Sequence, residues 1–206
     1  MPRIYCSGPL FSAEEIGAMN AIAAALEAAG HDTFLPHRDG LEPYVLQLAP
    51  HALGALVPAL RRAVDEAIFA LDVHALLGCD AVVCNLNGRV PDEGMIVEAS
   101  LAFAVGTPVV FYKADARAPF FGRDNAMLAG LASGTVADRI GDLPARVRAA
   151  IAARGAAGSP SAALAKVAAR GARVAHLLAS WPAGLGKQRW PEDLLAHIAA
   201  ALADGD

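Results

Sequence analysis

The feature that most constrains the fold is a short apolar run at residues 81–86, Ala-Val-Val-Cys-Asn-Leu. A strand that is apolar at almost every position is typical of a parallel sheet with helices on both faces. Other strand patterns lie at 3–7, 32–35 and 108–112, with a weaker candidate at 135–137, and helical patterns separate them. This alternation predicts an α/β fold with a parallel sheet and right-handed crossovers.

The helical patterns divide the chain into two predicted regions. Ser12 and Glu15 form a capping-box pattern that starts a helix ending at Gly30. Residues 37–42 predict a loop, and 44–77 are mostly helical with breaks near Pro50 and Pro58. Helices are also expected at 92–105 and 144–154. A small, flexible stretch after Gly155 predicts a catalytic domain at 1–154 and a helical C-terminal extension at 155–206.

The extension is expected to contain helices at 162–179 and 192–203, with Trp181 and Trp190 packing it on the core. Its role does not follow from its sequence.

Composition excludes several classes of protein. The 206 residues carry a net charge of −4 with acidic and basic groups interspersed, which argues against a nucleic-acid surface. No apolar run is long enough for a transmembrane helix, and no secretory signal is expected. The three cysteines, in apolar surroundings, predict core residues in a reducing compartment, hence the cytoplasm. The histidines lack ligand spacing, so no metal is expected.

Ligands of parallel α/β sheets bind beyond the carboxyl ends of the strands. Asn85 ends the central strand there, as either a ligand contact or a turn former. Gly8 and Phe11 follow the first strand, where a sugar or base could approach the backbone and stack on the ring. An ordinary strand-to-helix turn is the alternative interpretation.

Glu98 is the main candidate for chemistry. It is the only charge after the first turn of an apolar helical pattern at 95–105, so the helix is expected to be buried. A carboxylate is costly to bury without a partner. The alternatives are an edge residue paired with an arginine and a functional nucleophile.

Two aspartates could assist Glu98. Asp92 fits an ordinary helix N-cap, but glycosidic cleavage commonly needs a second carboxylate. Because residues six apart do not share a helix face, Asp92 has to precede the helix to serve the same substrate. Asp72 lies in a largely apolar helical run, where a solvated edge is the plainer interpretation.

Several ordered segments together resemble the nucleoside 2-deoxyribosyltransferase family, from Ile4 to about Leu128. The most specific is Pro-Asp-Glu-Gly-Met-Ile-Val-Glu-Ala at 91–99. The others are Ile-Tyr-Cys-Ser-Gly-Pro-Leu-Phe at 4–11, Phe-Leu-Pro-His-Arg-Asp-Gly at 34–40, 72–86, 104–109, and Gly-Arg-Asp-Asn-Ala-Met at 122–127.

The resemblance implies a flavodoxin-like subunit of a homo-oligomer, a dimer or hexamer, acting in nucleotide salvage without metal or organic cofactor. It implies that Glu98 attacks C1′ of a 2′-deoxynucleoside and that a free nucleobase then takes the sugar with retention. Tyr5 would hydrogen-bond Glu98. Asp72 and Asp92 would position and protonate the base or hold the sugar and nucleophile.

Asn125 would bind the 5′-hydroxyl group from a neighbouring subunit, and the loop 36–39 would face the base. Together with Gly8, Phe11 and Asn85, these segments give the residues predicted to bind the substrate. They are Gly8, Phe11, Pro36, Asp39, Asn85, Asn125 and Met127. The long extension departs from the family's usual length.

Two alternatives stay open. One is a hydrolase of deoxynucleosides or of their 5′-monophosphates, which would need a cationic or serine-rich phosphate pocket. The other is a non-catalytic nucleoside-binding module, which the set Asp72, Asp92 and Glu98 disfavours.

Overall fold

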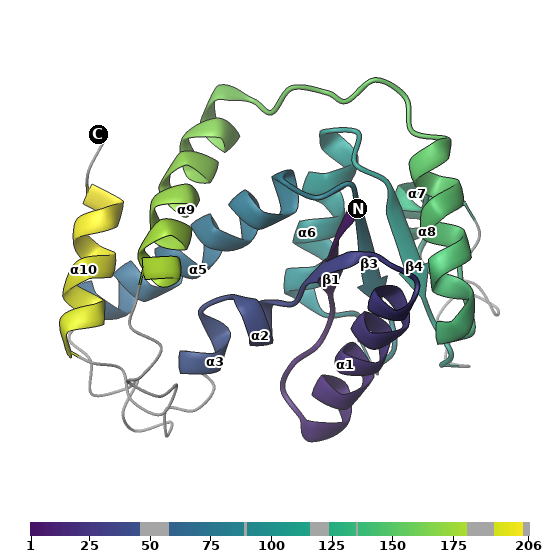
Figure 1. The fold of residues 1–206 in the computed structure, drawn as a ribbon, viewed down its shortest axis with the longest axis horizontal. Helices are drawn as coiled ribbons and strands as arrows, with labels where there is room; N and C mark the ends of the chain where they lie inside the picture. Colours follow the sequence, from purple (N-terminus) through teal and green to yellow (C-terminus); the bar gives the residue numbers. More distant parts are fainter. Residues whose placement is uncertain (46–57, 89, 116–123, 135, 181–191, 204–206) are drawn as a thin grey trace. The chain divides into compact units, whose positions relative to one another are not determined.

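The computed structural model describes residues 1–45, 58–88, 90–115, 124–134, 136–180 and 192–203. It forms two compact units (Figure 1). The first consists of Met1–Leu35 and Leu76–Pro160, and the second of Pro36–Ala75 and Ser161–Asp206. The predictions about Pro50, Trp181 and Trp190 fall outside the described residues.

The first unit is built on a parallel sheet with the strand order β2-β1-β3-β4. The strands are β1 (Arg3–Ser7), β2 (Asp32–Phe34), β3 (Ala81–Asn85) and β4 (Val109–Tyr112). Every residue of β3 and β4 is buried, which explains why these strands read as continuous apolar runs. The parallel α/β class is confirmed, and the strand order follows the flavodoxin-like pattern.

Of the predicted fifth strand at 135–137, residue 135 lies outside the described residues, and Ala137 alone of the other two pairs with the sheet. Ala137 forms a single parallel bridge with Tyr112, in which its N–H donates to Phe111 O and its carbonyl accepts from Lys113 N, both at 2.8 Å. Gly134 has a φ of 101°, so the chain is not in a strand conformation at that residue. The described sheet therefore has four strands rather than about five.

Helices cover both faces of this sheet. Figure 1 shows α1 (Ala13–Ala28) and α8 (Leu143–Ala152) in front of it and α6 (Glu93–Ala104) behind it. A 3-10 turn, η1 (Ile140–Asp142), precedes α8, and a short helix that was not predicted, α7 (Ala126–Leu131), follows β4. The core on the α1 and α8 side joins alternate strand residues to helix residues: Ile4, Cys6, Val83, Val110, Met19, Ile22, Leu26, Leu143 and Val147.

The start of α1 realises half of the predicted capping box. The Ser12 hydroxyl accepts from Glu15 N at 3.1 Å, as expected for an N-cap. The Glu15 carboxylate, however, accepts from Phe11 N, one residue earlier than a capping box requires. These two hydrogen bonds hold Phe11 and Ser12 against the first turn of α1.

The second unit is helical. It contains α2 (Pro36–Asp39), α3 (Glu42–Val45), most of α5 (Pro58–Leu77), α9 (Ala162–Ser180) and α10 (Glu192–Ala203). The expected loop at 37–42 is wrong except at Gly40 and Leu41, because α2 covers its start and α3 begins at Glu42. Pro36 opens α2, a position that suits proline. The core of the second unit is made by Leu41, Ala67, Leu71, Val174, Leu194, Ile198 and Leu202.

Candidate active site

Tyr5 and Ser7 stand on the same face of β1, because side chains two residues apart in a strand point the same way. Both are buried, and β1 lies in the sheet interior between β2 and β3. The Tyr5 ring stacks on Phe34 of β2 with centroids 5.3 Å apart. This packing fixes the phenol in place, so its hydroxyl group is a preorganised donor.

Both hydroxyl groups donate to Glu98 of α6. The Tyr5 hydroxyl reaches Oε1 at 2.5 Å, and the Ser7 hydroxyl donates to Oε2. Hydrogen bonds from neutral donors stabilise a carboxylate without cancelling its charge. The carboxylate is half-buried and held at both oxygens. A carboxylate that is oriented in this way is suited to act as a nucleophile.

Cys84, near the carboxyl end of β3, has a thiol whose pKa is affected by Glu98. Complete burial raises the pKa of the Cys84 thiol well above its usual value, and the charge of Glu98 raises it further. The thiol therefore stays protonated. Cys6, Cys79 and Cys84 are all buried and reduced, as expected for core residues.

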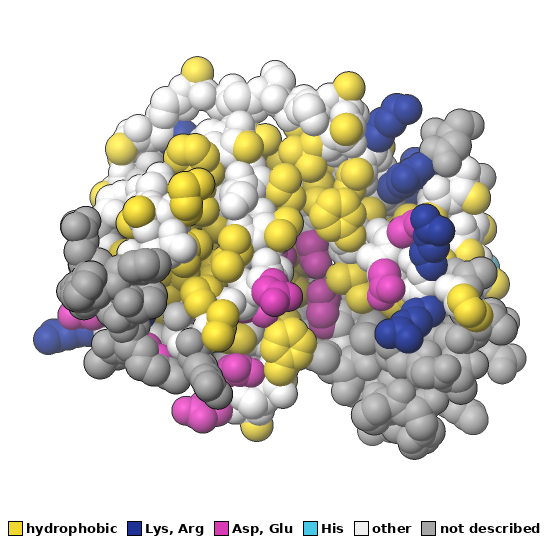
Figure 2. Space-filling model, turned by 180° about the vertical axis from the view of Figure 1, so that it is seen from behind, with side chains coloured by type: hydrophobic (Ala, Val, Ile, Leu, Met, Phe, Trp, Pro, Cys, Tyr) yellow, Lys and Arg dark blue, Asp and Glu magenta, His cyan; other side chains and the backbone are white. Residues whose placement is uncertain are grey.

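The predicted burial of the whole α6 helix is wrong. Met95, Ala99 and Ala102 are buried, but Val97 and Phe103 are 51% and 55% exposed. Figure 2 is viewed from the side on which α6 lies, and hydrophobic side chains are plainly visible on that face. An apolar helix is not necessarily a covered one, because the sheet takes only one side of it.

Asp92 caps α6 at the position its proposed role requires. It has an extended backbone conformation, and its Oδ2 accepts from Met95 N at 2.8 Å. It therefore precedes the helix, which is the position that Asp92 needs in order to serve the same substrate as Glu98. The ordinary N-cap interpretation is also correct, so the carboxylate has a structural function whatever else it does.

Gly8 and Asn85 meet where β1 and β3 end. A Cβ atom on Gly8 would lie 2.7 Å from Met19 Sδ and 2.8 Å from Asn85 Cβ, so the backbone approach requires glycine here. The Asn85 side chain is buried, and its Oδ1 accepts from Asn87 N at 3.0 Å, which makes it a turn former. Phe11 is 81% exposed, with its ring available for stacking.

A cavity of about 420 Å³ opens at this carboxyl end of the sheet. Asn87 builds part of its wall, because its Oδ1 accepts from both Ala114 N and Asp115 N after β4. Glu98 does not line this cavity. The lining residues are Pro9, Ser12, Glu14, Glu15, Ala18, Asn85, Asn87, Gly88, Ala114 and Asp115.

Asn125 and Met127 lie together at the start of α7. Asn125 is the N-cap, with Oδ1 accepting from Met127 N at 2.9 Å, and the Met127 side chain is 80% exposed. Just before them, Asp124 pairs with Lys113 from the end of β4. The ion pair ties this surface segment to the ligand side of the sheet.

The remaining predicted residues belong to the second unit. Asp72 on α5 forms a side-chain hydrogen bond with Glu42 of α3. Burial raises the pKa of Glu42, and this hydrogen bond only partly offsets the effect. Pro36 is buried at the start of α2, whereas Asp39 is exposed and pairs with Arg38 at 3.0 Å.

Two contacts went unrecognised in the sequence. Ser7 was not predicted as a partner of Glu98, although its spacing from Tyr5 places it on the same face of β1. Glu42 was part of a predicted loop, and only the tertiary structure brings it to Asp72. Within the described residues, no cluster of three or more His, Cys, Asp or Glu side chains could hold a metal ion.

None of the helices in the described parts of the chain combines the length and apolar character needed to cross a membrane. A search of curated proteins found no match. The fold resembles that of a conserved protein from Enterococcus faecalis V583, with a TM-score of 0.53 and 22% identity over 72% of this chain and 98% of that chain. A 2-deoxyribosyltransferase from the psychrotolerant bacterium Bacillus psychrosaccharolyticus gives a TM-score of 0.52 and 18% identity over 69% and 90% of the two chains.

These structural likenesses concern the fold. The assignment comes from the sequence itself, because residues 4–141 match the family model described as nucleoside 2-deoxyribosyltransferase. That range includes Tyr5, Ser7, Asp92 and Glu98, and it covers well over half of the 206 residues. The chain therefore belongs to the nucleoside 2-deoxyribosyltransferase family and has a function of that type.

Proposed function

We propose that this protein transfers 2-deoxyribose between nucleobases through a covalent intermediate on Glu98. The observation that carries the proposal is the pair of hydroxyl donors, Tyr5 and Ser7, that hold the two oxygens of this carboxylate. They orient it, and hydrogen bonds from donors of this kind stabilise the charged form of a carboxylate. An enzyme nucleophile needs both properties.

In the first step, a Glu98 oxygen forms a bond to C1′ of the deoxynucleoside. The C1′–N bond breaks, its electron pair stays on the base nitrogen, and that base takes up a proton. In the second step, a nitrogen of the acceptor base attacks C1′, loses its proton and releases the Glu98 carboxylate. Two inversions at C1′ give overall retention.

Asp92 and Asp72 are the proposed partners of this chemistry. They would protonate or position the base, or hold the sugar and the nucleophile. Asp92 is supported by its place directly before α6, where its carboxylate is outside the helix. Gly8, Phe11, Pro36, Asp39 and Asn85 are proposed substrate contacts; of these, Asn85 lines the cavity at the carboxyl end of the sheet.

Nucleosides suit this site better than nucleoside 5′-monophosphates. The Ser7 hydroxyl donates its proton to Glu98, so it is not available as a donor to a phosphate group. Of the described residues that line the cavity at the carboxyl end, Glu14, Glu15 and Asp115 are acidic and none is a lysine or an arginine. Such a lining repels a phosphate dianion.

The test is incubation of deoxyinosine with adenine, followed by chromatography. New deoxyadenosine indicates transfer, hypoxanthine alone indicates hydrolysis, and unchanged substrate indicates a binding module. Glu98→Ala should abolish transfer in a folded protein, and a 2′-fluoro-2′-deoxynucleoside should leave a mass adduct on the peptide that contains Glu98. Substantial transfer by Glu98→Ala would refute the assignment of the nucleophile.

We further propose a homo-oligomer, a dimer or hexamer, in which Asn125 and Met127 complete a neighbouring subunit's site. The exposure of both residues at the N-terminus of α7 supports this role. Glu98→Ala and Asn125→Ala would each be inactive alone. Co-expression should restore activity, since mixed oligomers contain sites with both residues intact, and no restoration in mixed oligomers would refute sharing of the site.

A further inference from the structure

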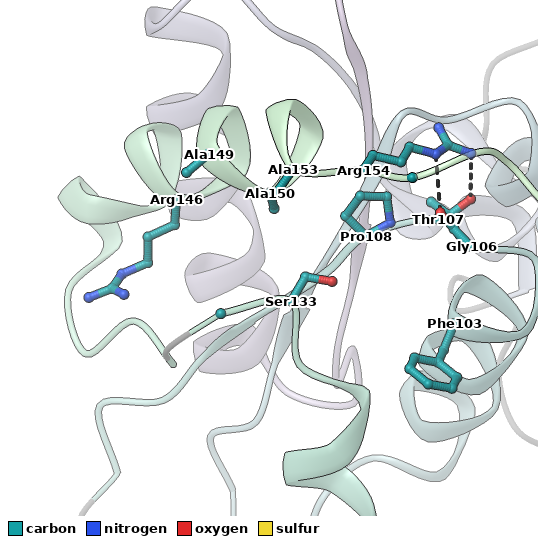
Figure 3. A pocket seen from close by; sticks show the side chains of 12 residues that line it. Phe103, Gly106, Thr107, Pro108, Ser133, Arg146, Ala149, Ala150, Ala153 and Arg154 are labelled. Atoms are coloured by element: carbon teal, nitrogen blue, oxygen red, sulfur yellow. Dashed lines mark hydrogen bonds between the residues drawn. The ribbon is translucent and has the colours of Figure 1, made fainter.

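A second cavity lies at the amino end of the strands, whereas Ser7 and Asn85 lie at the carboxyl end. Its volume is about 590 Å³, within the usual range of ligand pockets, roughly 300–1,000 Å³. Thr107 and Pro108 place it at the amino end of β4, and α8 forms its opposite wall (Figure 3). The transfer reaction proposed above uses residues near the carboxyl ends of the strands, so it does not account for this cavity.

Two arginines give the cavity its charge. Arg154, just after α8, donates from Nε to Gly106 O at 3.1 Å and from Nη2 to Thr107 Oγ1 at 3.4 Å. Both acceptors are neutral, so they orient the guanidinium and leave its charge uncancelled. Arg146 extends from α8 at the end of the cavity remote from Arg154 (Figure 3). No aspartate or glutamate is among the described lining residues.

Ser133 lies between the two arginines in Figure 3 and adds a neutral donor. Its hydroxyl oxygen accepts from Val109 N at 3.0 Å, and its own N–H donates to Val109 O at 2.7 Å. These contacts fix the residue on β4. The hydroxyl proton is still available, because accepting a hydrogen bond does not use it.

The rest of the lining is apolar and small. Ala149, Ala150 and Ala153 offer a wall without bulky side chains, and the Phe103 ring is half-exposed at the edge. A phenyl-sized group could pack between them. Pockets that combine an apolar wall with a few convergent polar groups are typical ligand sites.

From this combination we propose that the cavity binds a small organic oxyanion, a carboxylate or phosphate attached to a compact apolar body. The oxyanion contacts Arg154 and Ser133, and the apolar body packs on the alanines of α8 and on Phe103. Arg146 strengthens anion binding from the far end. The site is separate from the proposed transfer site.

Calorimetric titration of the full-length protein tests this proposal with phenyl phosphate, benzoate, benzamide and inorganic phosphate. We expect saturable binding of one phenyl phosphate or one benzoate per chain, and preference between the two identifies the oxyanion. Neutral benzamide should bind at least about tenfold more weakly, since a hydrogen bond to a charged group is worth that much or more. Absence of saturable binding by both anions, or equal binding of inorganic phosphate, would overturn the proposal.

Matched variants locate the site. Arg154→Met should weaken binding about 10- to 100-fold, whereas Arg148→Met should not change it, because Arg148 is an exposed arginine of α8 that does not line the cavity. Ala153→Leu should block binding by filling the cavity, which keeps the test decisive if Arg154→Met does not fold. Glu98→Ala should bind phenyl phosphate and benzoate as tightly as the wild type does. Binding at the cavity is therefore measured independently of whether the transferase proposal holds. Equal losses in Arg148→Met and Arg154→Met would count against the cavity.

Discussion

The carboxylate of Glu98 depends on two hydroxyl groups that come from one strand. Tyr5→Phe and Ser7→Ala each remove one donor, and a hydrogen bond to a charged group contributes about 1.5–3 kcal/mol. We expect either change to lower kcat for transfer about 10- to 100-fold, because the carboxylate loses its orientation. Ser100→Ala is the control, since that exposed hydroxyl of α6 only donates to Ile96 O. Wild-type kcat in Tyr5→Phe would contradict the assigned role.

Glu42 predicts a pH dependence of stability in the second unit. Burial raises the pKa of its carboxyl group above its ordinary value of 4.5, so the folded chain binds this proton more tightly than the unfolded chain. The contribution of this proton to the free energy of unfolding is fully present below pH 4.5. It is lost as the pH rises through the raised pKa of Glu42 in the folded chain. Glu42→Gln should therefore make the free energy of unfolding fall less steeply above that pH.

Urea denaturation at a series of pH values measures this effect. The exposed carboxylate Glu93 provides the control, because Glu93→Gln should leave the slope unchanged. The interpretation fails if the slopes of Glu42→Gln and the wild type coincide.

The residues of the candidate site differed in how far the sequence could reveal them. The structure contains the Tyr5–Glu98 hydrogen bond that the family resemblance implies. Strand alternation could also have indicated Ser7 once Tyr5 was chosen. Glu42 could not be identified in this way, because its contact with Asp72 joins two helices that are distant in the sequence. The exposure of Phe103 escaped prediction for a related reason, since burial depends on what packs against a helix.

At the scale of elements, the strands and long helices were predictable because their signals are local. β1 and α10 match their predicted bounds, and α6 starts immediately after its Asp92 cap. The short elements were not. α7 has only six residues, and its one signal is the capping side chain of Asn125. Too few residues lie in such a helix for a hydrophobic period to appear.

Asp92 allows its capping function to be separated from its proposed chemistry. Asp92→Ala removes the acceptor for Met95 N and should lower the free energy of unfolding by about 0.5–2 kcal/mol. Asp92→Asn keeps a good cap, so its stability should be close to wild type. Both changes remove the carboxylate and should slow transfer. Urea denaturation and the deoxyinosine–adenine assay measure the two properties, and full transfer by Asp92→Asn would limit Asp92 to capping.

The whole chain is organised in a way that a reading along the sequence does not show. The flexible stretch expected near 155–161 lies where the first unit ends, at Pro160. Residues 36–75, however, form one unit with the C-terminal extension, and Leu41 and Leu71 share a core with Val174. These contacts are long-range, so no local pattern announces them. The extension is thus part of a core rather than an appended tail.

Gly171 is the position at which this organisation can be tested. It lies within α9, and a Cβ atom there would come 1.9 Å from Ala70 O and 2.6 Å from His74 Cβ of α5. Backbone atoms cannot yield as a flexible side chain can, so Gly171→Ala should lower the free energy of unfolding by about 1–3 kcal/mol. Gly17, inside α1, has nothing within 4 Å of the same atom. Gly17→Ala should therefore raise that free energy by roughly 0.5–1 kcal/mol through helix propensity. Urea denaturation of both variants gives the signs, and stabilisation by Gly171→Ala would show that α9 does not pack on α5.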